Sequence, residues 1–142
     1  MVRKELFDKC VGLLEESGLG ENAVCEVTWV FEDVAEGEDI TSEQEKRISD
    51  IVTRRCEGYP LQYLLGQWEF YGLPFKVGEG VLIPRQDTET IVDTALKMFA
   101  DKKDITVIDL CSGSGCIGIT LERKLDCGRA VCVEKSEKAA EY

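Results

Sequence analysis

The sequence predicts an α+β protein, with an antiparallel helical bundle followed by a β-hairpin linker and then by a parallel βαβ unit. Apolar residues repeat with helical spacing through positions 1–58, whereas they alternate with polar residues after Pro60. Around residue 113, a glycine-rich turn joins a β-branched apolar run to another helical pattern. Since this turn begins past residue 105 of 142, we expect the βαβ unit to be incomplete.

Three amphipathic helices are predicted within positions 1–58, and they end near Gly18, Gly37 and Gly58. Ser42 and Glu45 have the spacing of a capping box at the start of the third helix. Short connections between the helices favour an antiparallel bundle. The stripes expected to be buried are Leu6, Phe7, Cys10, Val11 and Leu14; then Ala23, Val24, Val27, Val30, Phe31 and Val34; then Ile48, Ile51, Val52 and Cys56.

The net charge of −11 is concentrated in this helical segment, positions 1–58, which holds 7 basic and 15 acidic side chains. A surface of this sign repels nucleic-acid phosphates and anionic lipid, so we expect a protein partner with a basic patch and neither nucleic acid nor membrane. The acidic run of Glu32, Asp33, Glu36, Glu38 and Asp39 is predicted to be a solvated helix end, with a specific docking surface as the alternative.

The lack of a targeting signal and the pattern of cysteines predict a cytoplasmic protein. The segment Met1 to Cys10 mixes charges of both signs, which excludes a signal peptide, and no apolar run approaches the length of a membrane span. Seven cysteines without a C-x-x-C pair indicate reduced thiols. The spacing of Cys111, Cys116, Cys127 and Cys132 resembles a zinc site, but the intervening helix would hold the pairs about 15 Å apart. Because the chain also has no histidine, no metal site is expected.

The second half of the chain is predicted to contain both strands and helices. A hairpin is predicted around Gly72. Five aromatic residues are expected to pack as core between the two domains, with stacking on a base or ligand as the alternative; they are Tyr63, Trp68, Phe70, Tyr71 and Phe75. Asp87 is the expected N-cap of the next helix, whose predicted buried stripe is Ile91, Val92, Ala95 and Phe99.

The βαβ unit begins with a strand over 105–110. A helix over about 115–126 is expected to end at Gly128, and a second strand follows over 130–134. The residues from Ser136 onward have the pattern of one more helix.

The pattern Gly113-x-Gly115-x-x-Gly118 between a strand and a helix is typical of a nucleotide-cofactor loop. Glycines allow the backbone to approach a ligand closely. Glu134 stands at the tip of the next strand, at the expected separation from Gly113, and there its carboxylate can accept hydrogen bonds from both ribose hydroxyls. The alternative is a tight turn beside a solvated Glu134.

Asp109 distinguishes between cofactors. A carboxylate at the end of the first strand is unfavourable beside the pyrophosphate of NAD, but it suits a cation. S-adenosyl-L-methionine carries an amino group and a sulfonium and no phosphate, so Asp109 favours this cofactor. A structural role, in which Asp109 accepts hydrogen bonds from loop amides, is compatible with this interpretation.

Three segments then identify a family. They are PLQYLLGQWEFYGL at 60–73, LIPRQDTE at 82–89 and DLCSGSGCI at 109–117. In this order they resemble the peptide chain release factor N5-glutamine methyltransferases of the HemK or PrmC type. The resemblance covers essentially the whole chain and is weakest at positions 1–58.

The resemblance implies a helical release-factor-docking domain at 1-66, a hairpin linker at 67-84 and a truncated, Rossmann-like class I methyltransferase domain at 85-142. The parent enzyme would use S-adenosyl-L-methionine to methylate the side-chain amide of a glutamine in a release factor. The implied cofactor-binding residues are Asp109, Cys111, Ser112, Gly113, Ser114, Gly115 and Glu134. Pro84, Arg85, Thr88 and Glu89 would belong to a loop beside the cofactor and substrate pocket. Arg85 would either steer a cofactor carboxylate or pair with Asp87 or Glu89.

The chain departs from the family pattern in three ways. Cys111 stands where the family commonly has glycine, and Gln86 where it commonly has proline. The Asn-Pro-Pro-Tyr motif that holds the substrate amide is absent. We therefore expect no catalytic residue in this chain, no catalysis by it alone and weak cofactor binding at best. Two alternatives remain, namely a fragment of a nucleic-acid adenine N6-methyltransferase and a non-catalytic helical protein-binding module.

Overall fold

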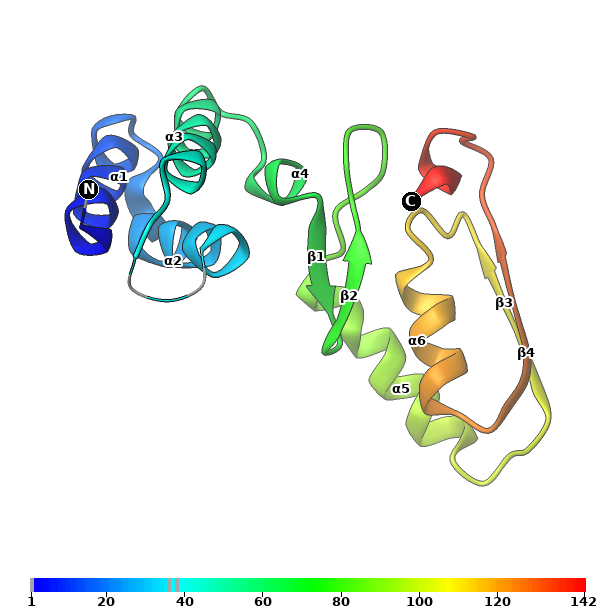
Figure 1. Cartoon of the computed structure of the whole chain (residues 1–142). Helices are drawn as coiled ribbons and strands as arrows, with labels where there is room; N and C mark the ends of the chain where they lie inside the picture. The colour runs from blue at the N-terminus through cyan, green and yellow to red at the C-terminus, as the bar shows by residue number, and fades with distance from the viewer. Residues whose placement is uncertain (1, 36, 38) are drawn as a thin grey trace. The chain divides into compact units, whose positions relative to one another are not determined.

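Figure 1 shows the computed structural model, which describes residues 2–35, 37 and 39–142. The chain divides into two compact units, Met1–Leu65 (unit 1) and Gly66–Tyr142 (unit 2), and each has its own buried apolar cluster. The mixture of helices and strands confirms the predicted α+β composition. The sequence-based division at 66/67 and 84/85 stays a prediction.

Unit 1 is helical, and α1, α2 and α3 pack against one another around a single core because each has an apolar stripe at helical spacing. Its elements are α1 (Arg3–Glu16), the short 3-10 helix η1 (Gly20–Asn22), α2 (Ala23–Val34), α3 (Ser42–Cys56) and α4 (Leu61–Leu65). The buried residues are Leu6, Cys10, Leu14, Ala23, Val27, Val30, Phe31, Ala35, Ile48, Ile51, Val52 and Leu61. The short helix α4 was not predicted.

The start of α3 differs from the prediction by one residue. Thr41, not Ser42, is the N-cap, since Gln44 N donates to Thr41 Oγ1 at 3.2 Å and Thr41 N donates to Gln44 Oε1 at 2.9 Å. The sequence offers two overlapping capping boxes, and the reciprocal bonds form in the earlier one. In α2, Val24 is 56% exposed, so its prediction as a core residue was wrong.

Ion pairs connect α2 to α3. Arg55 donates to both carboxylate oxygens of Glu26, at 2.6 and 3.0 Å, and this hydrogen bonding raises the Arg55 pKa. Arg47 pairs with Asp33 at 3.0 Å, and the Asp33 side chain is only 16% exposed. Asp33 is therefore not a solvated end residue as predicted, whereas Glu36 and Glu38 of the same acidic run lie outside the described residues.

Unit 2 begins with a hairpin of β1 (Gln67–Phe70) and β2 (Leu73–Lys76), in antiparallel register with Trp68 opposite Phe75. The connection between the strands, Tyr71 and Gly72, has positive φ at both positions, as hairpin turns that match the strand twist require. Phe70 and Phe75 are buried and their rings meet edge to face. They share a core with Val92, Cys116 and Leu121, so the hairpin packs within unit 2.

The helix after the hairpin starts later than predicted. A 3-10 turn, η2 (Gln86–Thr88), precedes α5 (Glu89–Phe99), and Thr88 is the N-cap residue in place of Asp87. Asp87 contributes through its backbone instead, because its carbonyl accepts a 2.7 Å hydrogen bond from Thr90 Oγ1. The predicted stripe is only partly correct: Val92 is buried, but Ile91 is 52% and Phe99 40% exposed.

The βαβ unit consists of β3 (Ile105–Leu110), α6 (Cys116–Lys124) and β4 (Cys127–Val133), and the two strands pair in parallel. The second strand begins at Cys127, earlier than the predicted position 130, and it includes Gly128. Gly128 is therefore no left-handed helix cap; α6 ends at Lys124, and Leu125 after it has an extended conformation. A short 3-10 helix, η3 (Ala139–Glu141), follows where a longer helix was expected.

The β3–β4 pair is covered by α6 on one face (Figure 1). Asp109 and Cys132 face α6, because a side chain at Gly118 would meet both of them. Alternate residues point the other way, and there Ile108 is 62%, Leu110 69% and Val133 46% exposed. Parallel strands are normally apolar and covered on both faces, so this pair leaves an apolar face open to solvent.

Candidate functional site

The glycine-rich loop between β3 and α6 is built on left-handed backbone. Cys111 (φ 61°), Gly113 (φ 56°) and Gly115 (φ 74°) all have positive φ. Gly115 N donates to Ser112 O at 2.8 Å, which closes the turn, and Ser112 N donates to Val133 O at 3.1 Å, which joins the loop to the end of β4. The loop therefore has one defined course from the end of β3 into α6.

Glu134 holds this loop through backbone amides. Its Oε2 accepts from Gly113 N and its Oε1 from Ser136 N, both at 2.8 Å. These two bonds lower the Glu134 pKa, that from Ser136 more than that from Gly113, because they stabilise the ionised carboxylate. Glu134 is thus half-buried and bonded directly to the loop.

Asp109 has the structural role that its position in the sequence left open. Its Oδ2 accepts a 2.9 Å hydrogen bond from Gly118 N in the first turn of α6. An anionic acceptor is favourable at this end of a helix. The Oδ1 atom of Asp109 accepts no hydrogen bond from the residues that the structure describes.

Gly115 and Gly118 are required for steric reasons. A Cβ at Gly115 would lie 3.0 Å from Ile119 Cδ1, at a φ that already disfavours side chains. A Cβ at Gly118 would lie 2.9 Å from Cys132 Sγ and 3.0 Å from Asp109 Cβ. Gly118 therefore allows α6 to pack closely on the two strands, which is the function of the third glycine in cofactor loops.

The chain is similar to known proteins of one kind. A family described as the PrmC N-terminal domain matches residues 25–66. A release factor glutamine methyltransferase of Fusobacterium nucleatum is 35% identical over 146 residues, covering 95% of this chain and 41% of that protein. One of Geobacter sulfurreducens is 37% identical over 147 residues, covering 96% of this chain and 50% of that protein. The chain is thus similar over nearly its whole length to release factor glutamine methyltransferases. It spans half or less of the length of these curated relatives.

Glu89, at the end of the motif segment 82–89, has a structural role. Glu89 Oε1 accepts a 2.7 Å hydrogen bond from Tyr71 N, and the Tyr71 hydroxyl donates to Asp93 Oδ1 at 2.7 Å. The bond to Asp93 raises the Tyr71 pKa. Glu89 and Asp93 therefore anchor the hairpin turn to α5, and they support Tyr71 in its left-handed conformation.

The other predicted site residues of this segment differ in burial. Pro84 is buried, Thr88 is half-buried at the start of α5, and Arg85 is exposed. The Arg85 side chain pairs with neither Asp87 nor Glu89 in the described part of the chain, so the structure gives the ion-pair alternative no support.

The segment between the hairpin and Pro84 was not predicted as part of the site. Val81 is buried and would be 3.8 Å from a Cβ at Gly113, so it lies beside the cofactor loop. A Cβ at Gly80 would lie 2.7 Å from Lys138 Cδ, and one at Gly78 would meet the Tyr142 ring. The signal was present in the sequence as two glycines separated by one residue, in Gly78-Glu79-Gly80.

Two thiols near the loop, Cys116 and Cys132, are not poised as nucleophiles. All seven cysteines lie in the described part of the chain and are free. Burial raises the pKa values of Cys116 and Cys132, and Asp109 raises both further. Burial likewise raises the pKa of Cys10 in unit 1 to about 11. Across the described residues, no three or more Cys, Asp or Glu side chains are grouped as a metal site, and no helix is long and apolar enough to cross a membrane.

Proposed function

We propose that this chain supplies the docking domain and the S-adenosylmethionine loop of a Rossmann-like methyltransferase that modifies the side-chain amide of a glutamine in a peptide chain release factor. The names of the relatives support the reaction and the substrate. The observation that carries the proposal for the cofactor is the loop itself, in which Glu134 joins the glycine turn after β3 to the residues after β4.

The loop residues fit an adenosyl group with no phosphate. Each oxygen of Glu134 accepts one amide hydrogen bond and keeps a lone pair, which suits the two ribose hydroxyls. The Oδ1 atom of Asp109 adds negative charge near the first turn of α6. The segment 109–118 includes no basic side chain that would favour a pyrophosphate. This charge pattern favours the amino group and sulfonium of S-adenosylmethionine, which supplies the methyl group when bound.

The first residues of the loop are open to solvent, and this limits what the chain does by itself. Cys111 is exposed, and Leu110 beside it is 69% exposed. Sites that bind small molecules tightly bury about 70–90% of the ligand surface. We therefore propose that this chain binds the cofactor weakly and transfers no methyl group alone, with Cys111, Ser112, Gly113, Ser114 and Gly115 lining the contact.

Two-dimensional NMR of the 15N-labelled chain tests the cofactor site, because chemical shifts detect weak binding. Addition of S-adenosylmethionine should shift the amide signals of the loop and of residues 134–136, and those of unit 1 should stay unchanged. ATP at the same concentration serves as the control ligand. Unchanged loop signals at saturating cofactor would refute the assignment, and they would leave unit 1 as a binding module without a cofactor.

A further inference from the structure

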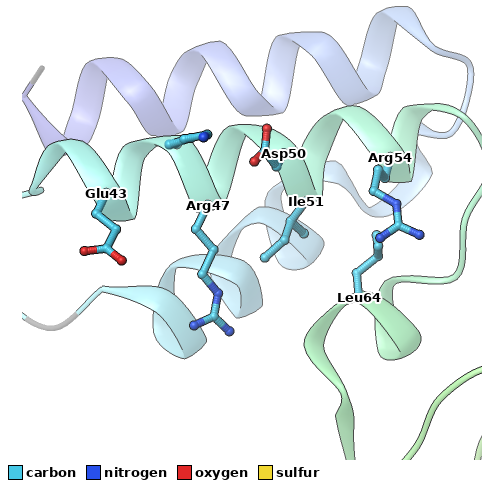
Figure 2. A pocket seen from close by; sticks show the side chains of 7 residues that line it. Glu43, Arg47, Asp50, Ile51, Arg54 and Leu64 are labelled. Atoms are coloured by element: carbon cyan, nitrogen blue, oxygen red, sulfur yellow. The ribbon is translucent and has the colours of Figure 1, made fainter.

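Unit 1 has a hollow of about 420 Å³ along α3 (Figure 2). Figure 2 shows Glu43, Arg47 and Ile51 on one row of α3, with Leu64 of α4 beside Arg54. Helical spacing produces this arrangement, since residues 43, 47 and 51 and residues 46, 50 and 54 form two neighbouring rows. The lining residues are Glu43, Lys46, Arg47, Asp50, Ile51, Arg54 and Leu64.

The chemistry of this hollow differs from that of the rest of unit 1. Three of the seven basic side chains of unit 1 line it, but only two of the fifteen acidic ones. The hollow thus has a formal charge of +1, whereas the remainder of the unit has −9. Its floor is apolar, because Ile51 is 7% exposed and Leu64 is half-buried.

Two of the three basic side chains are not engaged with carboxylates of the described residues. Arg47, the third, pairs with Asp33 at 3.0 Å. The Arg54 guanidinium lies 4.4 Å from the centre of the Tyr59 ring, and within the described part of unit 1 neither Arg54 nor Lys46 forms an ion pair with a carboxylate. Lys46 and Arg54 therefore keep their charges available to a ligand, and the Tyr59 ring restricts the orientations of Arg54.

We propose that this hollow receives an acidic segment of the release factor, with one large apolar side chain on the Ile51 and Leu64 floor and carboxylates at Lys46 and Arg54. This inference rests on the proposed function for the identity of the partner. The charges argue for the occupant, because the remainder of unit 1 has a formal charge of −9, so Lys46 and Arg54 attract an acidic segment more than the rest of the unit does. A partner with a basic patch, which net charge alone predicts, would contact the surrounding surface and leave the hollow empty.

Charge reversal of one side chain provides the test. Fluorescently labelled, purified bacterial release factor is titrated with the chain, and binding is followed by anisotropy. Lys46→Glu should weaken binding at least about tenfold, since tenfold corresponds to about 1.4 kcal/mol, which is within the range for one charged contact. Lys9→Glu is the matched control, because Lys9 is an exposed lysine on α1 that does not line the hollow, and it should change the affinity less than about twofold.

Competing peptides test the chemistry of the occupant. A synthetic peptide of alternating Glu and Leu should displace the release factor from the wild-type chain but not from Lys46→Glu, and a Lys and Leu peptide of equal length should not compete. Equal losses in Lys46→Glu and Lys9→Glu, displacement by the basic peptide, or no binding of wild type would each overturn the inference. The cofactor titration of unit 2 is independent of all three results, so the cofactor part of the proposed function is tested separately.

Discussion

The hydroxyl of Thr120 in α6 provides a quantitative test of the packing beneath the cofactor loop. Thr120 is fully buried, and its Oγ1 has no hydrogen-bond partner among the residues that the structure describes. A buried polar group without a hydrogen-bond partner costs about 1–3 kcal/mol of folding free energy. In valine, a methyl group of nearly the same size replaces the threonine hydroxyl. Thr120→Val should therefore raise the free energy of unfolding of unit 2 by about 1–2 kcal/mol.

Urea unfolding can measure this change in unit 2 separately. The chain has two tryptophans, Trp29 in unit 1 and Trp68 in unit 2, so a Trp29→Phe background makes fluorescence report on unit 2. With a slope of about 1–2 kcal/mol per molar urea, the midpoint should rise by about 1 M. Thr106→Val, at an exposed position of β3, is the matched control and should change the free energy by less than about 0.5 kcal/mol. An unchanged or lower midpoint for Thr120→Val would show that the hydroxyl is satisfied in solution.

Three further predictions concern the loop and the start of α3. Cys111→Gly should stabilise unit 2 by about 0.5–1 kcal/mol, because relief of left-handed strain exceeds the added entropy of the unfolded chain; a lower urea midpoint would contradict this. The folded-state pKa of Glu134 is depressed, so the contribution of its carboxylate to loop order is complete above the usual pKa of 4.5 and is lost as the pH falls through the lower folded-state pKa. The Gly113 and Ser136 amide signals should shift together in that acidic range, and a shared shift near neutral pH would contradict this. Thr41→Ala should destabilise unit 1 by about 1 kcal/mol and Ser42→Ala by much less in thermal unfolding, with the reverse order expected only if Ser42 is the cap.

The sequence predicted the elements that have strong periodicity. It did not predict features for which adjacent residues are alternatives, such as the capping residue of α3 and the buried residues of α5. The strand over 105–110 was predicted with correct bounds because β-branched residues and a following glycine turn define it. The capping residue was misassigned because Thr41 and Ser42 are equally able to cap, and only the reach of the Gln44 side chain selects between them. Ile91 and Phe99 were predicted as core from spacing alone, but the packing partners of α5 bury the neighbouring Val92 instead.

The candidate site was predictable in its residues but not in its hydrogen bonds. The spacing of Gly113 and Glu134 predicted that they belong to one site, and the structure joins them through a direct bond. Spacing does not reveal that each Glu134 oxygen accepts one hydrogen bond from a backbone amide, because this depends on the course of residues 134–136 after β4. Helical spacing places Lys46 and Arg54 on one row of α3, but only the structure places Leu64 of α4 beside them to form the hollow.

Saturation-transfer difference NMR on an equimolar mixture of S-adenosylmethionine and ATP tests whether this loop binds an adenosyl cation without phosphate. We expect transfer to the ribose and adenine protons of S-adenosylmethionine, little transfer to ATP, and loss of the signal in Glu134→Ala. Equal or stronger transfer to ATP, or an unchanged signal in Glu134→Ala, would show that the loop does not have this specificity.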